Sequence, residues 1–185
     1  MGQMILVIGG SASGKSAFAE KLAKERESGG KIYIATMKPC DAECKERIRK
    51  HRERRKEADY ETVECFGRSL MEARRDKHAG KTGLFECMSN YASNVMFGDY
   101  DPFHAVTFTK EKLQSLSEEM VSELSALNDR LEELIIVTND VFSDGNVYDE
   151  MTMSYLALLG LCNQKLADKA DQVYEVVCGI AVRCR

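Results

Sequence analysis

The residues that most directly suggest chemistry are the eight that follow the first apolar run of the chain. They read Gly9-Gly10-Ser11-Ala12-Ser13-Gly14-Lys15-Ser16, directly after Met4-Ile5-Leu6-Val7-Ile8. A Gly, four residues and then Gly-Lys-Ser, placed after a strand, is the pattern of a phosphate-binding loop. In such a loop the backbone N–H groups line an anion site, the Lys reaches the outer phosphates, and the Ser hydroxyl holds Mg²⁺. The spacing predicts that this loop binds a nucleoside triphosphate and that Lys15 takes part in catalysis; the alternative is a glycine-rich turn that matches by chance.

A carboxylate that could complete a magnesium site ends another predicted strand, Leu84-Phe85-Glu86. Phosphate loops usually work with an acidic residue at a neighbouring strand end. We therefore expect Glu86 to face the metal, against the alternative of an ordinary strand-end carboxylate, with Asp140 as a second candidate. Thr36, Glu86 and Asn139 should all lie at the carboxyl ends of parallel strands, where open sheets bind their ligands. Thr36 is accordingly expected near the nucleotide.

His51 lies in a run of positive charge, because seven of the ten residues from Arg47 to Lys56 are Lys or Arg. On a helix, Arg47 and Arg55 would lie one turn on either side of His51, with Arg54 close by. Neighbouring cations disfavour the imidazolium form, and a neutral imidazole can attack phosphorus while guanidinium groups neutralise a triphosphate. The alternative is a solvated helix face, which is what most charge runs are.

The other two histidines, His78 and His104, have no such setting and are expected at the surface. Cys40, Cys44, His51 and Cys65 match no common zinc spacing, so packing or incidental thiols are the better account of these cysteines.

The elements that must position these residues alternate between short apolar strands and helical stretches. This alternation predicts an α/β fold with a mostly parallel sheet and helices on both faces. Six strands are expected: Gln3–Ile8, Lys31–Thr36, Tyr60–Val63, Thr82–Glu86, Leu134–Thr138 and Gln172–Cys178.

Four helices are expected between these strands. The first follows Ser16 and ends at Gly29-Gly30, and the second runs from Asp41 to about Lys56. The third lies near Lys110–Glu132, and the fourth covers Met151–Ala170. The third carries an apolar stripe that should face the core or another subunit: Leu113, Leu116, Met120, Leu124, Leu127 and Leu131. The segment Gly98–Phe108 lacks helical period and is expected to form a surface loop or lid.

Composition limits the classes of protein to consider. The chain has 185 residues, a net charge of −4 and 44% hydrophobic residues, which suits one soluble globular domain over residues 1–185. The charge gives no general attraction to nucleic acid, and no apolar run is long enough for a membrane span. Seven scattered cysteines and the lack of a secretory signal favour reduced thiols in the cytoplasm. A timed GTPase switch is not expected, because Thr138-Asn139-Asp140-Val141 lacks the Lys of a base-reading motif.

With these residues in view, the chain resembles the bifunctional adenosylcobinamide kinase/adenosylcobinamide-phosphate guanylyltransferase family of cobalamin biosynthesis. The resemblance is most specific in the block Glu46–Arg55 around His51. It extends over nearly the whole chain: 5–16, Phe18-Ala19-Glu20, 32–36, 46–55, Thr62-Val63-Glu64, 86–89, Ser93-Asn94, 137–141, Gly160, Asn163-Gln164, Ala167, Ala170-Asp171 and Gly179-Ile180.

The resemblance implies a RecA-like phosphate-loop fold, a homotrimer and two reactions at one site. A triphosphate, ATP or GTP, phosphorylates the hydroxyl of adenosylcobinamide. His51 then takes GMP from GTP and passes it to the new phosphate, giving adenosylcobinamide-GDP. The site would comprise Lys15, His51, the phosphate loop, Thr36, and three arginines (Arg47, Arg54 and Arg55), with Mg²⁺ on Ser16 and Glu86.

The chain departs from the family pattern at three places. Family members usually have Asp at the position of Glu86 and Glu at that of Asp140. A Pro and paired arginines expected late in the family are replaced by Asn146–Glu150 and Ser154–Ala157, which contain no Arg. Two alternatives therefore stay open: a small-molecule kinase without guanylyl transfer, and a nucleotide-binding homologue that has lost catalysis.

Overall fold

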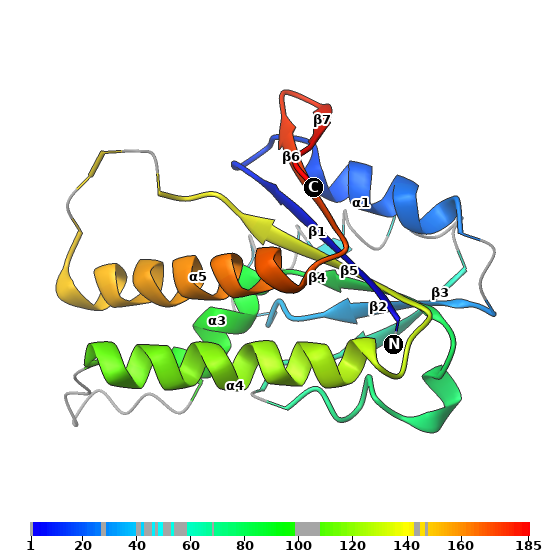
Figure 1. The fold of residues 1–185 in the computed structure, drawn as a ribbon, viewed down its shortest axis with the longest axis horizontal. Coiled ribbons are helices and arrows are strands. Elements are labelled where there is room, and N and C mark those ends of the chain that lie inside the picture. Colours follow the sequence, from blue (N-terminus) through cyan, green and yellow to red (C-terminus); the bar gives the residue numbers. More distant parts are fainter. Residues whose placement is uncertain are drawn as a thin grey trace.

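The computed structural model contains a seven-stranded sheet in which a strand from the start of the chain lies beside strands from its end (Figure 1). The structure describes residues 2–26, 29–39, 42, 46, 48–49, 53, 59–67, 69–98, 108–142, 145–146 and 148–185. The strands are β1 (Gln3–Gly9), β2 (Lys31–Ala35), β3 (Tyr60–Glu64), β4 (Thr82–Glu86), β5 (Glu133–Asn139), β6 (Gln172–Val177) and β7 (Ile180–Arg183). Their order in the sheet is β3-β2-β4-β5-β1-β6-β7, and only the pairing of β7 with β6 is antiparallel.

Helices cover both faces of the sheet. They are α1 (Lys15–Lys24), α3 (Met88–Phe97), α4 (Lys110–Asn128) and α5 (Glu150–Lys169), with a short 3₁₀ turn, η1, at Asp76–His78. In Figure 1, α1 lies on the side of the sheet opposite α4 and α5. The alternation along β1 explains the two layers, because successive side chains point to opposite faces of a strand. Met4 and Leu6 pack in the core with α3, α4 and α5, whereas Ile5 and Val7 pack with α1.

The predicted fold class is confirmed, and all six predicted strands are present with ends that differ by at most one residue. The stripe on α4 faces the core: Leu113, Leu116, Met120, Leu124 and Leu127 are buried. Two helix ends were predicted wrongly. α1 ends at Lys24 rather than at Gly29-Gly30. α4 ends at Asn128, so Leu131 is buried from the connection that follows it, where it packs against Gly83 of β4.

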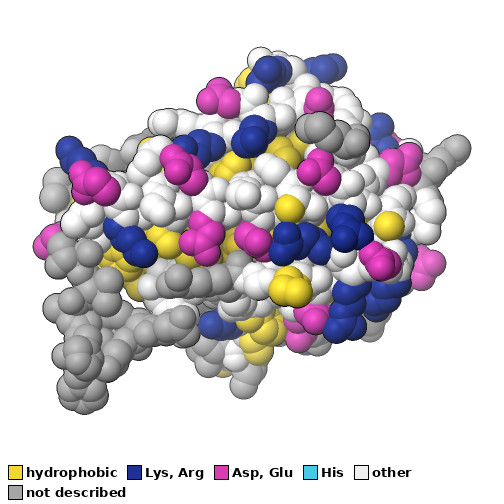
Figure 2. All heavy atoms as spheres, turned by 60° about the horizontal axis from the view of Figure 1, so that its bottom comes forward, with side chains coloured by type: hydrophobic (Ala, Val, Ile, Leu, Met, Phe, Trp, Pro, Cys, Tyr) yellow, Lys and Arg dark blue, Asp and Glu magenta, His cyan; other side chains and the backbone are white. Residues whose placement is uncertain are grey.

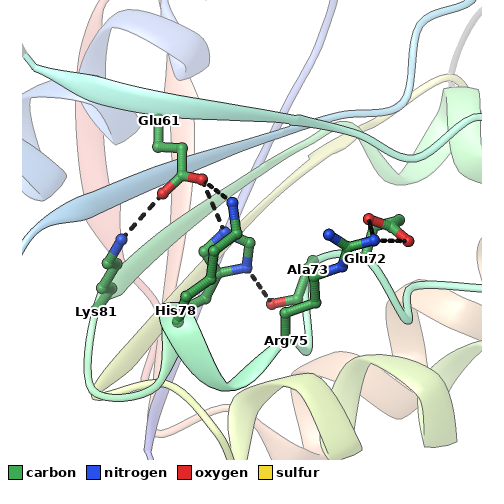
Figure 3. Close-up of polar contacts among 7 residues, drawn as sticks. Glu61, Glu72, Ala73, Arg75, His78 and Lys81 are labelled. Atoms are coloured by element: carbon green, nitrogen blue, oxygen red, sulfur yellow. Dashed lines mark hydrogen bonds and ion pairs between the residues drawn. The ribbon is translucent and has the colours of Figure 1, made fainter.

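The expectation that His78 lies at the surface is wrong, because its side chain is buried beneath β3 (Figure 3). Its Nδ1 is 3.1 Å from the carbonyl oxygen of Ala73, and its Nε2 is 3.2 Å from a carboxylate oxygen of Glu61. Glu61 also accepts hydrogen bonds from Lys77 Nζ at 2.5 Å and Lys81 Nζ at 3.0 Å. These partners hold the pKa of Glu61 down at about 2, with the bond from Lys77 the largest cause. This set of groups, which we term the Glu61 cluster, fixes η1 to the edge strand.

On the face of the molecule in Figure 2, no large area carries charges of a single sign. There, basic and acidic side chains are interspersed, and hydrophobic ones form small separate patches (Figure 2). Within the described ranges, no helix is long and apolar enough to cross a bilayer.

Candidate functional site

The phosphate loop joins β1 to α1 in a conformation that depends on two glycines. Gly14 has φ +94°, a left-handed conformation that residues with a side chain rarely adopt. Gly9 is needed for close approach, since a Cβ there would lie 2.5 Å from Ser13 Oγ and 2.6 Å from the carbonyl oxygen of Val176. Lys15 Nζ donates to the carbonyl oxygen of Gly10 at 2.9 Å, so its ammonium group folds back over the loop.

The start of α1 suits an anion. Gly14 occupies the capping position and offers no side-chain acceptor to the first N–H groups of the helix. Such N–H groups, together with the positive end of the helix dipole, bind phosphate well. Ser11, Ala12 and Ser13 complete the loop between Gly10 and Gly14, and Ala12 also has a positive φ, of 55°.

Glu86 meets the phosphate loop from the end of β4. It is buried, and its Oε1 accepts a hydrogen bond from the hydroxyl of Ser16. Its other carboxylate oxygen accepts from the hydroxyl of Tyr33 at 3.0 Å, which reaches across from β2. Residues 70 positions apart in the chain are thus joined at the N-terminus of α1. Tyr33 was not among the predicted site residues; its position inside an apolar strand gave no signal of a polar role.

The Ser16 hydroxyl and the Glu86 carboxylate suit a magnesium ion. Mg²⁺ prefers oxygen ligands and is commonly held by one or two protein groups, substrate phosphates and water. Within the part of the chain that the structure describes, no group of three His, Cys, Asp or Glu residues could hold a metal ion by itself.

Thr36 organises the carboxyl ends of β2 and β4. Its hydroxyl lies 2.9 Å from the carbonyl oxygens of both Glu86 and Cys87, and it accepts from the N–H of Cys87 at 2.7 Å. Asn94 of α3 donates to the carbonyl oxygen of Thr36 at 2.8 Å. Thr36 therefore serves as a fully bonded anchor beside Glu86.

A second set of polar contacts continues along the same edge to β5. Asn139 Nδ2 donates to Ser89 Oγ at 2.7 Å, and the thiol of Cys87 lies 3.0 Å from the same oxygen. Burial raises the pKa of the Cys87 thiol, so the neutral form is favoured there. Thr36, Glu86 and Asn139 do meet at the carboxyl ends of their strands, as predicted.

Asp140 occupies a different place from Glu86. Its N–H donates to the carbonyl oxygen of Gly9 at 3.0 Å, and its Oδ1 accepts from the N–H of Phe142 at 3.3 Å. The carboxylate thus turns the chain as it leaves β5, next to the phosphate loop. Of the two acidic candidates, only Glu86 is hydrogen-bonded to Ser16.

The β6–β7 hairpin supports the loop from the other side, and the sequence reading missed it. The N–H of Gly179 donates to the carbonyl oxygen of Ser13 at 2.8 Å. Cys178 and Gly179 both have positive φ, at 51° and 81°. A two-residue turn with positive φ between two apolar runs is the usual hairpin signal, and Gly179 supplied it. Of the seven cysteines, Cys65, Cys87, Cys162, Cys178 and Cys184 are free thiols in the structure.

Several predicted residues lie outside the described part of the chain: His51, Arg47, Arg54, Arg55, Asp41, Cys40, Cys44 and His104. In the same basic stretch, Arg49 is described. It pairs with Glu46 at 2.6 Å and Glu53 at 2.5 Å on an exposed helix face, and these carboxylates raise its pKa. The roles of His51 and its neighbouring arginines stay predictions.

Residues 5–184 match the family described as cobinamide kinase / cobinamide phosphate guanyltransferase. The chain belongs to this family. It is accordingly a transferase with kinase and nucleotidyltransferase activities, and the predicted resemblance is confirmed. Both activities draw on nucleoside triphosphates, which suits the phosphate loop.

Curated relatives match along almost their whole length. The chain is 32% identical over 185 residues to the bifunctional adenosylcobalamin biosynthesis protein CobU of Escherichia coli (strain K12), covering 98% of this chain and 99% of that one. It is 30% identical to CobU of Salmonella typhimurium, with the same coverage. It is 31% identical over 176 residues to CobP of Pseudomonas aeruginosa, covering 95% and 93%.

Solved structures share the fold at low identity. The flagellar accessory protein FlaH from Methanocaldococcus jannaschii has a TM-score of 0.50 at 10% identity, covering 99% of this chain and 78% of its own. An ATPase from the type III secretion system of pathogenic bacteria has a TM-score of 0.52 at 12% identity, covering 99% and 57%. These likenesses concern the fold alone.

Proposed function

We propose that this chain phosphorylates adenosylcobinamide and then transfers GMP from GTP to adenosylcobinamide phosphate. The observation that carries the proposal is the contact between Ser16 and Glu86 beside the loop that Lys15 closes, in a chain of the cobinamide kinase family. The continuous sheet, which uses strands from both ends of the chain, supports one kinase/nucleotidyltransferase domain over residues 1–185.

In the kinase step, the substrate hydroxyl oxygen attacks the γ-phosphorus of the triphosphate. The bond to the β-phosphate oxygen breaks, the nucleoside diphosphate leaves, and the hydroxyl proton is released. The N–H groups of residues Gly9 to Ser16 hold the phosphates. The ammonium group of Lys15 stabilises the negative charge on the phosphoryl group as it is transferred. Ser16 and Glu86 would hold Mg²⁺, which when bound neutralises phosphate charge. Thr36 fixes the strand end that presents Glu86.

In the guanylyl step, an imidazole nitrogen of His51 attacks the α-phosphorus of GTP, and pyrophosphate leaves. A phosphate oxygen of the substrate then attacks the His51-bound phosphorus, the N–P bond breaks, and free His51 returns. Arg47, Arg54 and Arg55 would neutralise the triphosphate during the first attack. We also propose a homotrimer, as the family resemblance implies, that works in the cytoplasm, as the scattered cysteines indicate.

The test is covalent labelling of the purified chain with GTP carrying the label at the α- or the γ-phosphate. The α-label should remain on denatured parent protein and the γ-label should not, while His51→Ala should retain neither. Equal α-labelling of His51→Ala overturns the assignment of His51. Turnover of cobinamide without any α-labelling indicates a small-molecule kinase alone, and triphosphate binding without turnover indicates a homologue that has lost catalysis.

A further inference from the structure

An exposed apolar surface lies on the first half of α5, and the reactions above do not use it. We define the α5 strip as Phe142, Met153, Ala157 and Gly160. Met153, Ala157 and Gly160 are spaced by four and three residues, so they share one helix face. Phe142 is 44% exposed and Met153 is 46% exposed. The Phe142 ring lies against α5 at Gly160, with ring atoms 3.7 and 3.8 Å from where a Cβ would be, which is ordinary van der Waals distance.

The α5 strip begins next to the phosphate loop. Asn139 pairs in register with Gly9 at the ends of β5 and β1, and the N–H of Asp140 donates to the Gly9 carbonyl oxygen at 3.0 Å. The N–H of Phe142 then donates to Asp140 Oδ1 at 3.3 Å. The strip thus adjoins the edge where the triphosphate would sit, and a substrate lying on it could extend one arm into the loop.

The charges around the strip oppose an anionic occupant. Asp140, Asp149 and Glu150 flank the strip in the sequence, and the described residues from Asn139 to Gln164 include no Lys, Arg or His. Asp149 caps α5 and accepts from Thr152 N at 3.0 Å and from Thr152 Oγ1 at 2.7 Å. These bonds lower the pKa of Asp149, with the side-chain bond as the larger cause, so it stays ionised. This acidic character favours an apolar or cationic group over an anionic one here.

We propose that the α5 strip is the surface on which the corrin ring of the cobinamide substrate lies. This inference rests on the proposed function. An adenosylcobinamide molecule carries one net positive charge, because cobalt(III) is balanced by one negative charge on the corrin and one on the alkyl ligand. Its ring has broad apolar faces and an amide-bearing rim. The ring fits the Phe142 and Met153 side chains, and its charge fits the acidic surroundings.

The experiment measures binding of cobinamide directly, by equilibrium dialysis with its visible absorbance as the readout, on the full chain. Two variants disrupt the strip: Ala157→Arg adds bulk and positive charge, and Phe142→Ala removes the ring. Met71→Arg is the matched control, because Met71 is 68% exposed and lies outside the strip. Affinity for a fluorescent GTP analogue and the thermal unfolding midpoint are measured on the same samples.

We expect Ala157→Arg to weaken cobinamide binding at least about tenfold and Phe142→Ala severalfold, with GTP affinity and unfolding midpoint unchanged. Met71→Arg should bind as the parent does. If both strip variants bind cobinamide like the parent, the strip is not its site, while the proposed function stands. If Ala157→Arg changes only the oligomeric state, the strip is a contact between copies and the inference is overturned. If the parent does not bind cobinamide at all, the proposed substrate itself is wrong, and the inference falls with it.

Discussion

Two carboxylates of the same sheet, Glu86 and Glu61, accept hydrogen bonds from different kinds of group. Register places Glu86 beside Ala35 and Glu61 beside Ile32, so they lie about three residues, or roughly 10 Å, apart along β2. Glu61 accepts hydrogen bonds from two ammonium groups and contacts an imidazole. Glu86 accepts hydrogen bonds from the hydroxyls of Ser16 and Tyr33.

The difference separates a carboxylate used for structure from one suited to binding. Removing Glu61 would leave cationic neighbours without their acceptor, so its role is fixed by its partners. Neutral hydroxyl donors can rotate toward water or bind a metal ion, so a cation can take their place beside Glu86. Because Glu86 has such hydroxyl partners, we expect the metal and the nucleotide to bind at the carboxyl edge of the sheet.

The largest effect should come from the cation of the phosphate loop. Lys15→Ala removes the ammonium group that would follow the transferred phosphate, and we expect kcat/KM of the kinase step to fall by about 10²- to 10³-fold. Lys77→Ala, which removes a cation from the Glu61 cluster instead, should leave kcat/KM unchanged. Initial rates with cobinamide and ATP or GTP measure both. If Lys15→Ala and Lys77→Ala lost kcat/KM equally, the proposed difference between the phosphate loop and the Glu61 cluster would be contradicted.

A smaller effect should follow from exchanging each carboxylate for its amide. Glu86→Gln keeps an acceptor for a hydroxyl but removes the charge that a metal requires, so activity or Mg²⁺ affinity should fall about 10- to 100-fold. The unfolding midpoint should change little. Glu61→Gln should give the reverse pattern, with normal rates and a lower midpoint. A Mg²⁺ titration of the kinase rate, run beside thermal unfolding, decides between these outcomes.

The smallest effect concerns pH and the Glu61 cluster. The pKa of Glu61 is lowered from 4.5 to about 2 by Lys77, Lys81 and His78, so folding favours its ionised form. The stability that this carboxylate adds is therefore present above about pH 4.5 and is lost as the pH falls toward 2. Parent protein and Glu61→Gln should differ by a few degrees in midpoint near pH 6, and the difference should shrink on acidification. A difference that is constant from pH 7 to pH 3 would contradict this account.

The strands and the phosphate loop at the carboxyl edge of the sheet could be predicted from the sequence because their signals are local. The phosphate loop is a fixed spacing, and Glu86 ends a strand whose five residues are all buried. Strand ends could be read to within one residue, since apolar runs stop where the chain leaves the sheet.

What sequence reasoning missed depends on contacts between distant segments. His78 has a polar sequence neighbourhood, but Glu61 and Ala73 supply partners for both of its ring nitrogens, so it can be buried. In the sequence alone, Tyr33 looks like an ordinary strand residue. Its polar role is evident only from its hydrogen bond to Glu86 in the folded chain. The contact of Gly179 with Ser13 joins the two ends of the chain, and no local pattern encodes it.

The central place of β1 has a consequence for synthesis on the ribosome. Gln3 pairs with Glu133 and Ile5 with Gln172, so β1 is translated well before the two strands that pair with it. An aliphatic segment therefore waits without hydrogen-bonded partners for most of translation, exposed to chaperones and to other nascent chains. The hydrogen bond from Gly179 to the carbonyl oxygen of Ser13 forms only after the β6–β7 hairpin has been translated, so the phosphate loop acquires this support late.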